Sequence, residues 1–117
     1  MHALVALILI LASAAGFPST APGSGTVTSS AVVTNGFTRG TVGLQSTQAG
    51  TLTVQRYVDG AGLVPVNSPA ITVAIVANTP NSVGWADGLP CGSIIVSFTN
   101  GSGSTATLSN FVVNLTP

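Results

Sequence analysis

Few side chains in this sequence can take part in acid–base, nucleophilic or metal chemistry. The 117 residues include one histidine, His2, one cysteine, Cys91, and two acids, Asp59 and Asp87. A hydrolytic triad needs a nucleophile, a base and an orienting group. His2 stands next to the first residue and beside an apolar run, which is a poor place for a catalytic base. We therefore expect no catalytic residues and no enzyme activity.

The two aspartates are equally unsuited to a carboxylate pair or a metal site. Each precedes a glycine, in Asp59-Gly60 and Asp87-Gly88, and this pairing is typical of turns. Calcium needs several oxygen ligands, and a structural zinc site needs more nitrogen and sulfur ligands than one histidine and one cysteine provide. The sequence thus predicts no metal and no cofactor. It favours Cys91 as a small buried hydrophobic residue, with a disulfide to another subunit as the alternative.

Arg56 and Trp85 are the remaining side chains with distinctive chemistry. Arg56 and Asp59 flank Tyr57 at the end of a predicted strand, so the two charges can pair across the turn. Stacking of Arg56 on Trp85 or Tyr57 is the alternative, and either contact would be structural. Trp85, in the stretch VGWADGLP, fits a packing position in the core better than an exposed aromatic binding residue.

The elements that hold these residues must form a domain with almost no charge. Charged residues make up 3% of the chain and hydrophobic residues 45%, whereas an ordinary soluble domain has about 25% charged residues. The surface must then be built from Ser, Thr, Asn, Gln and Gly. Such a surface lacks the repulsion that keeps free proteins apart, and it lacks the clustered Lys and Arg that bind nucleic acid. It suits a protein held in an assembly or on a cell exterior.

Turn residues divide the chain beyond residue 25 into short runs rich in Val, Ile, Thr and Leu. Breaks about every 8 to 12 positions are typical of all-β sandwiches and barrels. We expect an all-β domain, an antiparallel β-sandwich of about seven strands with Ig-like topology, and a jelly roll as the alternative. Four breaks are Asn-Gly or Asp-Gly pairs, which tolerate the positive φ of tight hairpin turns: Asn35-Gly36, Asp59-Gly60, Asp87-Gly88 and Asn100-Gly101.

Alternation within the runs predicts which side chains share a face. The segments 26–35 and 38–46 alternate less cleanly, which favours edge positions or contact with another chain. In the other runs the residues expected on one face are Leu52 and Val54; Ile71, Val73 and Ile75; Ile94, Val96 and Phe98; and Phe111, Val113 and Leu115.

The first 25 residues differ from the rest, and we divide the chain into 1–25, an apolar N-terminal arm with a spacer, and 26–117, the sandwich. Residues 3–16 carry no charge, and the spacer is rich in Pro, Gly and Ser. One interpretation is a signal peptide cut after Ala12-Ser13-Ala14, although no Lys or Arg precedes the apolar run. The run is short for a membrane span, which needs about 20 apolar residues. The other interpretation is an arm that is retained for assembly.

The stretch from Gly50 to Leu115 resembles small β-sandwich virion proteins of tailed bacteriophages. The resemblance lies in GTLTVQRYVDGAG, where a strand leads to an Asp-Gly turn, and in SIIVSFTNGSGSTATLSNFVVNL, where a Ser/Thr-rich turn precedes a last apolar strand. It implies a virion accessory role, as a capsid decoration (cement) protein or a tail or fibre component. The apolar N-terminus is not part of this pattern.

We therefore expect a non-enzymatic structural protein of the virion that stabilises the assembly through its β-domain and N-terminal arm. Its expected partners are the major capsid protein or other virion subunits and copies of itself, with no nucleic acid. A membrane enters only if the N-terminal run is a signal or anchor. The alternative is an exported bacterial cell-surface or adhesion module with a cleaved signal peptide. The residues expected to make assembly contacts are Leu4, Val5, Leu7, Ile8, Leu9, Ile10, Leu11 and Phe17.

Overall fold

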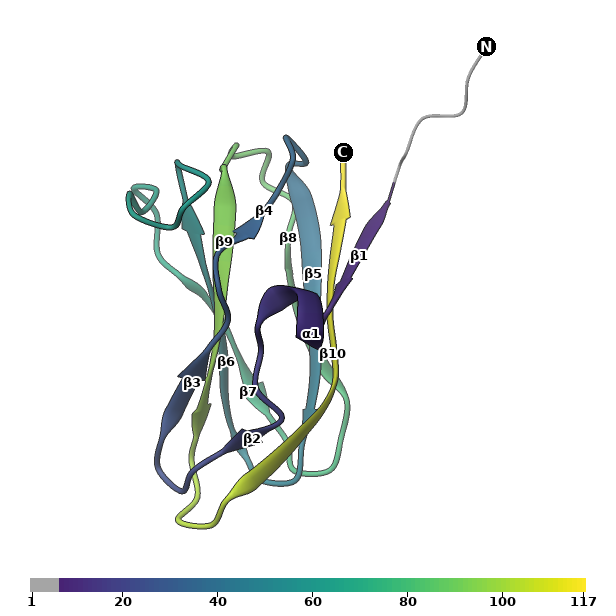
Figure 1. The fold of residues 1–117 in the computed structure, drawn as a ribbon, viewed down its shortest axis with the longest axis vertical. Coiled ribbons are helices and arrows are strands. Elements are labelled where there is room, and N and C mark those ends of the chain that lie inside the picture. Colours follow the sequence, from purple (N-terminus) through teal and green to yellow (C-terminus); the bar gives the residue numbers. More distant parts are fainter. Residues whose placement is uncertain (1–6) are drawn as a thin grey trace.

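The structure, a computed structural model, describes residues 7–117, which form two antiparallel sheets packed face to face (Figure 1). One helix of four residues lies in this part of the chain, before residue 26, so the all-β prediction is confirmed. The elements are β1 (Ile8–Leu11), α1 (Ala12–Ala15), β2 (Thr20–Ala21), β3 (Thr26–Thr28), β4 (Val32–Val33), β5 (Arg39–Ser46), β6 (Gly50–Tyr57), β7 (Ile71–Ile75), β8 (Asn81–Trp85), β9 (Ser93–Asn100) and β10 (Ala106–Thr116).

The strand order is that of a jelly roll, the alternative topology, instead of the Ig-like order. One sheet runs β1-β10-β5-β8, with β2 also on β10, and the other runs β3-β9-β6-β7, with β4 also on β9. If β1 with β2 and β3 with β4 are each taken as one interrupted strand, each sheet has four positions. Of the connections between these strand positions, only the β6–β7 loop joins two strands of the same sheet. All the others lead from one sheet to the opposite sheet. Crossing connections, with the first strand beside the last, characterise the jelly roll.

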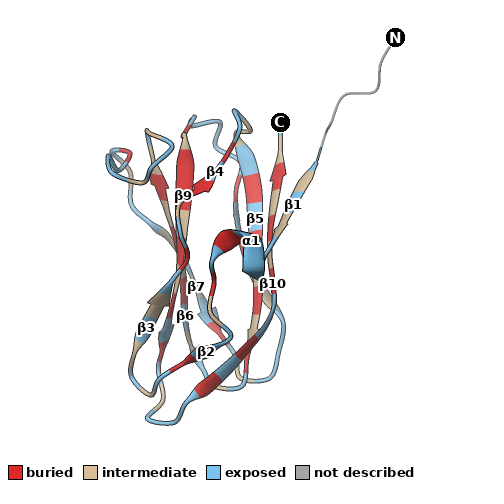
Figure 2. Cartoon of the chain, viewed as in Figure 1, coloured by how far each residue is buried: buried red, intermediate tan, exposed pale blue. Residues whose placement is uncertain are grey.

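The core lies between the sheets and is filled by every second side chain of the long strands (Figure 2). Side chains on β6, β9 and β10 that were predicted to share a face are all buried. On β7, Ile75 is buried, and Ile71 and Val73 pack against the core. The inward faces predicted for these four strands are therefore confirmed.

The prediction of an edge position for residues 38–46 is wrong, because β5 lies between β10 and β8. Its burial alternates regularly, with Gly40, Val42, Leu44 and Ser46 turned inward. The alternation of apolar and polar residues is hard to recognise in the sequence, because glycine occupies an inward position at Gly40 and an outward position at Gly43. Gly40 is needed where it stands, since an added Cβ would lie 2.4 Å from Cζ2 of Trp85.

Replacement of Gly40 with alanine should lower the free energy of unfolding by about 1–3 kcal/mol, the usual cost of overpacking a filled core. The reason is that the Trp85 ring, which is 6% exposed, must move away from the new methyl group. Urea unfolding measures this change. The matched control is Gly103→Ala, since a Cβ at Gly103 meets nothing within 4 Å. A Gly40→Ala protein as stable as this control would contradict the packing described for Trp85.

Three of the four predicted turn pairs lie in connections that lead from one sheet to the other, and only Asp59-Gly60 lies in a loop between neighbouring strands. Asn35-Gly36, between β4 and β5, has positive φ at both residues, 53° and 79°, and Gly88, between β8 and β9, has φ 75°. Gly60 and Gly101 do not have positive φ. Asn100 is the last residue of β9. Its buried side-chain amide donates to the backbone carbonyls of Ala21, Pro22 and Ser104. Two of the four pairs thus have the expected left-handed backbone.

Residues 8–21 pack on the sandwich, although the sequence suggested a separate arm. β1 and β2 pair with the upper and lower parts of β10, and α1 occupies the interruption between them (Figure 1). The ring of Phe17 stacks on Phe111 with centroids 4.4 Å apart, and Ala15 and Ala21 are also buried. A small sandwich gains a further strand position and part of its core from this segment.

Candidate contact surface

The two ends of the sandwich differ in chemistry. The loops 34–38, 58–70 and 86–92 form one end, which we call the charged end because Arg39, Arg56, Asp59 and Asp87 all lie in or beside it. The loops 22–25, 47–49, 76–80 and 101–105 form the neutral end, which has no charged residue. The charged side chains of the domain are therefore gathered at one end.

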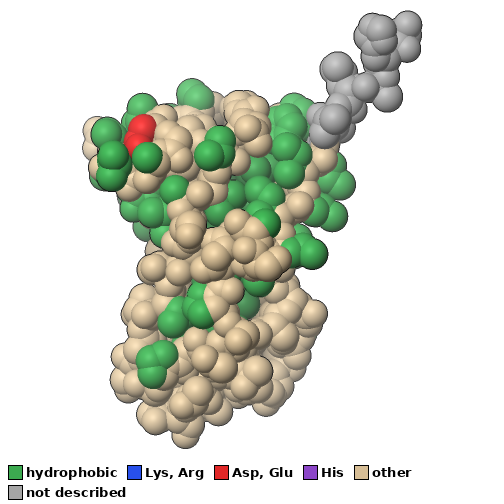
Figure 3. Space-filling model, viewed as in Figure 1, with side chains coloured by type: hydrophobic (Ala, Val, Ile, Leu, Met, Phe, Trp, Pro, Cys, Tyr) green, Lys and Arg blue, Asp and Glu red, His purple; other side chains and the backbone are tan. Residues whose placement is uncertain are grey.

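Exposed apolar side chains follow the same division. In the view of Figure 3, hydrophobic side chains gather on the upper half of the molecule, and the lower half is mostly polar. Nine large hydrophobic residues are exposed in the described part of the chain, and only Val76 belongs to the neutral end. The others form two groups. The loop patch comprises Val33, Val58, Leu63, Val64 and Leu89, and the leucine row on or beside β1 comprises Leu7, Leu9 and Leu11.

Asp59 fixes the loop that displays part of this patch. Its carboxylate accepts hydrogen bonds from the backbone N–H groups of Ala61 at 3.0 Å, Leu63 at 3.0 Å and Val64 at 2.8 Å. These donors, Val64 foremost, hold the pKa of Asp59 below its ordinary value. The Val58 N–H adds a bond to the Val64 carbonyl at 2.7 Å. The result is an ordered loop that presents Leu63 with 77% of its surface exposed.

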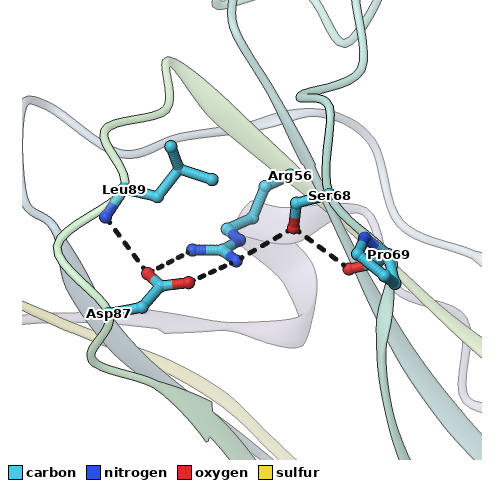
Figure 4. A network of polar contacts seen from close by, with 5 residues as sticks. All are labelled: Arg56, Ser68, Pro69, Asp87 and Leu89. Atoms are coloured by element: carbon cyan, nitrogen blue, oxygen red, sulfur yellow. Dashed lines mark hydrogen bonds and ion pairs between the residues drawn. The ribbon is translucent and has the colours of Figure 1, made fainter.

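Arg56, near the end of β6, contacts two loops of the charged end, 58–70 and 86–92. Its side chain is 4% exposed, and its guanidinium donates to both carboxylate oxygens of Asp87, at 2.7 and 2.8 Å (Figure 4). The Asp87 side chain is 53% exposed. A longer bond of 3.4 Å reaches Ser68 Oγ, and the Leu89 N–H donates to Asp87 at 3.1 Å. The hydrogen bonds from Arg56 lower the pKa of Asp87 to about 2. Loops 58–70 and 86–92 are thereby held together.

The predicted Arg56–Asp59 pair is wrong. Arg56 shares the inward face of β6 with Leu52 and Val54, so its guanidinium points between the sheets, toward Asp87. The Asp59 carboxylate is occupied by its own loop. Both aspartates take structural roles near turns, as the Asp-Gly pattern suggested.

Trp85 takes the packing role that the sequence favoured over an exposed binding role. Its ring is 6% exposed and lies against Gly40, while its indole Nε1 has no hydrogen-bond partner. Burial raises the pKa of the Cys91 thiol, which fits a packing role. An open pocket of about 510 Å³ lies at this end, formed by Arg39, Gly40, Thr41, Trp85, Ala86, Asn114, Thr116 and Pro117.

The residues expected to make assembly contacts divide into three groups. Leu4 and Val5 lie outside the described residues. Ile8 and Ile10 turn inward and pack against the core, and Phe17 is buried in the core of its own domain. Leu7, Leu9 and Leu11 are 47%, 58% and 60% exposed and are available to a partner.

The loop patch was missed by the sequence analysis. Its signal is the stretch Val58 to Val66, where apolar side chains stand within a turn-rich segment between two predicted strands. Turn residues there identify a loop, and several leucine and valine side chains close together in a surface loop are candidates for an apolar contact patch.

Neither a metal site nor a membrane-spanning helix was found in residues 7–117. No group of three or more His, Cys, Asp or Glu side chains comes together in this part of the chain. No helix there has the length and hydrophobicity needed to cross a bilayer. His2 lies outside the described residues.

The chain has similar folds among solved structures but no similar sequence among protein families or curated proteins. Among solved structures, the PBSX exported protein XepA is similar over 93% of this chain with a TM-score of 0.62 and 10% identity. The enzymatically active domain of tailspike protein 4 from Bacteriophage CBA120 is similar over 82% of this chain with a TM-score of 0.57 and 19% identity. PirA is similar over 99% of this chain with a TM-score of 0.52 and 8% identity.

These likenesses concern the fold alone. This chain covers 36% of XepA and 15% of the tailspike structure, but 97% of PirA. The same sandwich fold therefore occurs as one part of the larger XepA and phage tailspike chains and as nearly the whole of PirA.

Proposed function

We propose that this protein is a non-enzymatic structural component of a tailed-phage virion, a capsid decoration protein or another accessory subunit. In this proposal the loop patch and the leucine row bind neighbouring subunits. The partners are the major capsid protein, other virion subunits or copies of the same chain. We also propose that the protein is located in the virion.

The segregation of exposed apolar side chains carries this proposal. A monomer rarely exposes a large apolar patch without a partner for it, and here eight of the nine exposed large hydrophobic residues of the described chain lie at the charged end or on or beside β1. The remaining surface has too few charges to keep many free copies apart in solution. Both features favour a protein that works in an assembly.

Two further observations agree with the proposal. Similar sandwiches occur in the phage-related proteins described above. The ordered Asp59 loop presents its apolar side chains without a further cost in loop ordering, which improves the affinity of a contact. An exported cell-surface module is the alternative function, and XepA is described as an exported protein.

The proposal predicts that the protein is a stoichiometric component of purified phage particles and that the loop patch holds it there. Replacement of both Leu63 and Val64 with serine removes two apolar side chains, each worth about 1.5–3 kcal/mol when fully buried. Since about 1.4 kcal/mol is a factor of ten in affinity, occupancy at limiting protein concentration should fall at least tenfold. Quantitative mass spectrometry of particles measures occupancy.

Val76→Ser is the matched control, since Val76 is 59% exposed but lies at the neutral end. It should leave occupancy unchanged. If the unmodified protein is absent from purified particles and is found in the cell-envelope fraction, the cell-surface alternative is correct and the virion proposal is not.

A further inference from the structure

β1 is an open sheet edge that lacks the usual protection. It is the outermost strand of its sheet and pairs with β10 alone among the described residues (Figure 1). Its other side presents backbone N–H and C=O groups that have no strand partner within residues 7–117. In natural proteins, a charged residue, a proline, a β-bulge or a covering segment usually prevents an edge strand from pairing with another chain. The β1 sequence, Ile-Leu-Ile-Leu, contains no charge and no proline.

The other edges of the sandwich are less open to a new strand. β7 and β8 end their respective sheets and lie next to each other, so each shields the other. β3 and β4 share the remaining edge as pieces of three and two residues, and β3 is Thr-Val-Thr. β1 is therefore the edge with the longest uninterrupted apolar strand.

We propose that β1 pairs antiparallel with β1 of a second copy of this chain, so that the two four-position sheets become one continuous sheet. A two-fold axis at Leu9 places Leu9 opposite Leu9 of the second copy and Leu7 opposite Leu11. Because side chains alternate between faces, this register keeps the leucine rows of both copies together on the outer face. The isoleucines of β1 remain turned toward the two cores.

The absence of charge supports a second copy as the occupant. Identical strands pair poorly when a charged side chain must face itself, and residues 7–11 contain none. The leucine row is 47–60% exposed in one copy and would be partly covered by the row of the other. An antiparallel strand pair also provides main-chain hydrogen bonds, as in β-strand addition.

The size of the contact sets its strength. A pair of strands of four or five residues falls below the roughly 1,200 Å² of a stable complex, so the isolated dimer should be weak and concentration-dependent. Many copies held side by side in an assembly would face each other at high effective concentration, which compensates for a weak contact. This last step rests on the proposed function, whereas the pairing itself does not.

Sedimentation velocity over a range of concentrations tests the pairing with the complete chain. The unmodified protein should dimerise reversibly, and Leu9→Lys should raise the dissociation constant at least tenfold because two like charges then face each other. The control is Val76→Lys, which adds the same charge at an exposed side chain of the neutral end, outside the loop patch and the leucine row, and should dimerise like the unmodified protein. Circular dichroism checks that both variants are folded.

The register has its own test. In Leu9→Cys protein, mild oxidation should join two copies through this position, whereas the unmodified protein, whose Cys91 is buried, should stay unlinked. A protein that remains monomeric at every concentration, or a Leu9→Lys variant that dimerises normally, would overturn the pairing. Either result leaves the particle experiment with Leu63 and Val64 unaffected, so failure of the pairing and failure of the virion proposal can be distinguished.

Discussion

Replacement of Phe17 with alanine is expected to lower the free energy of unfolding by about 3–5 kcal/mol, the usual cost of removing a buried aromatic ring. Phe17 is 6% exposed, and its ring stacks on Phe111 at 4.4 Å with an angle of 14° between the planes. Its backbone N–H also closes α1 by donating to the Ala12 carbonyl at 2.9 Å. The ring therefore joins the N-terminal segment to the core, and urea unfolding of the complete chain measures the loss.

Leu63→Ala is the control for this experiment. Leu63 is more exposed than any other large hydrophobic residue described, so its truncation should change stability by no more than about 0.5 kcal/mol. If Phe17→Ala is as mild as the control, residues 12–21 contribute no core, and the division of the chain at residue 25 would describe the protein better.

Loss of the Asp87 carboxylate is expected to have the second large effect. Asp87→Asn leaves Arg56, whose side chain is 4% exposed in the unmodified protein, without its ionic partner, and an unpaired buried charge is strongly destabilising. Replacing both residues, as Arg56→Met with Asp87→Asn, removes the charge along with its partner. The double variant should therefore be more stable than Asp87→Asn alone, and thermal unfolding of the three proteins tests this order.

The same pair predicts a loss of stability in acid. The folded pKa of Asp87 is lowered from 3.8 to about 2, so the folded state favours the ionised carboxylate. Its contribution is complete above pH 4 and is lost as the pH falls from about 4 to 2. In the double variant this part of the acid dependence should disappear. An unchanged acid profile would show that the ion pair does not stabilise the fold.

The sequence predicted the strands better than their order. Alternation along β6, β7, β9 and β10 is a local property, and it identified the inward faces correctly. Strand order depends on which sheet each connection enters, and an Asn-Gly pair fits a turn whether or not the chain crosses between sheets. β5 was assigned to an edge because glycine has no hydrophobic signal, although Gly40 is buried by the adjacent Trp85 ring.

The N-terminal segment could not be placed from sequence because its hydrophobicity fits several destinations. An apolar run suits a signal peptide, an arm or a strand, and its strand character depends on β10 as a partner. Phe17 lies just before Pro18, where the sequence suggests a linker, and only the packing on Phe111 reveals its role. The loop patch, similarly, depends on strand β4 and two loops, 58–70 and 86–92, which are distant in the sequence and meet at one end.

The intact mass of the native protein, measured on the chain recovered from particles or cells, tests most directly whether the N-terminal strand belongs to the working molecule. We predict a mass that includes residues 8–11, since β1 pairs with β10 along its whole length. A chain that begins at Ala15, after a cut behind Ala12-Ser13-Ala14, would have lost β1 and the leucine row. That result would contradict the account and favour the exported cell-surface module.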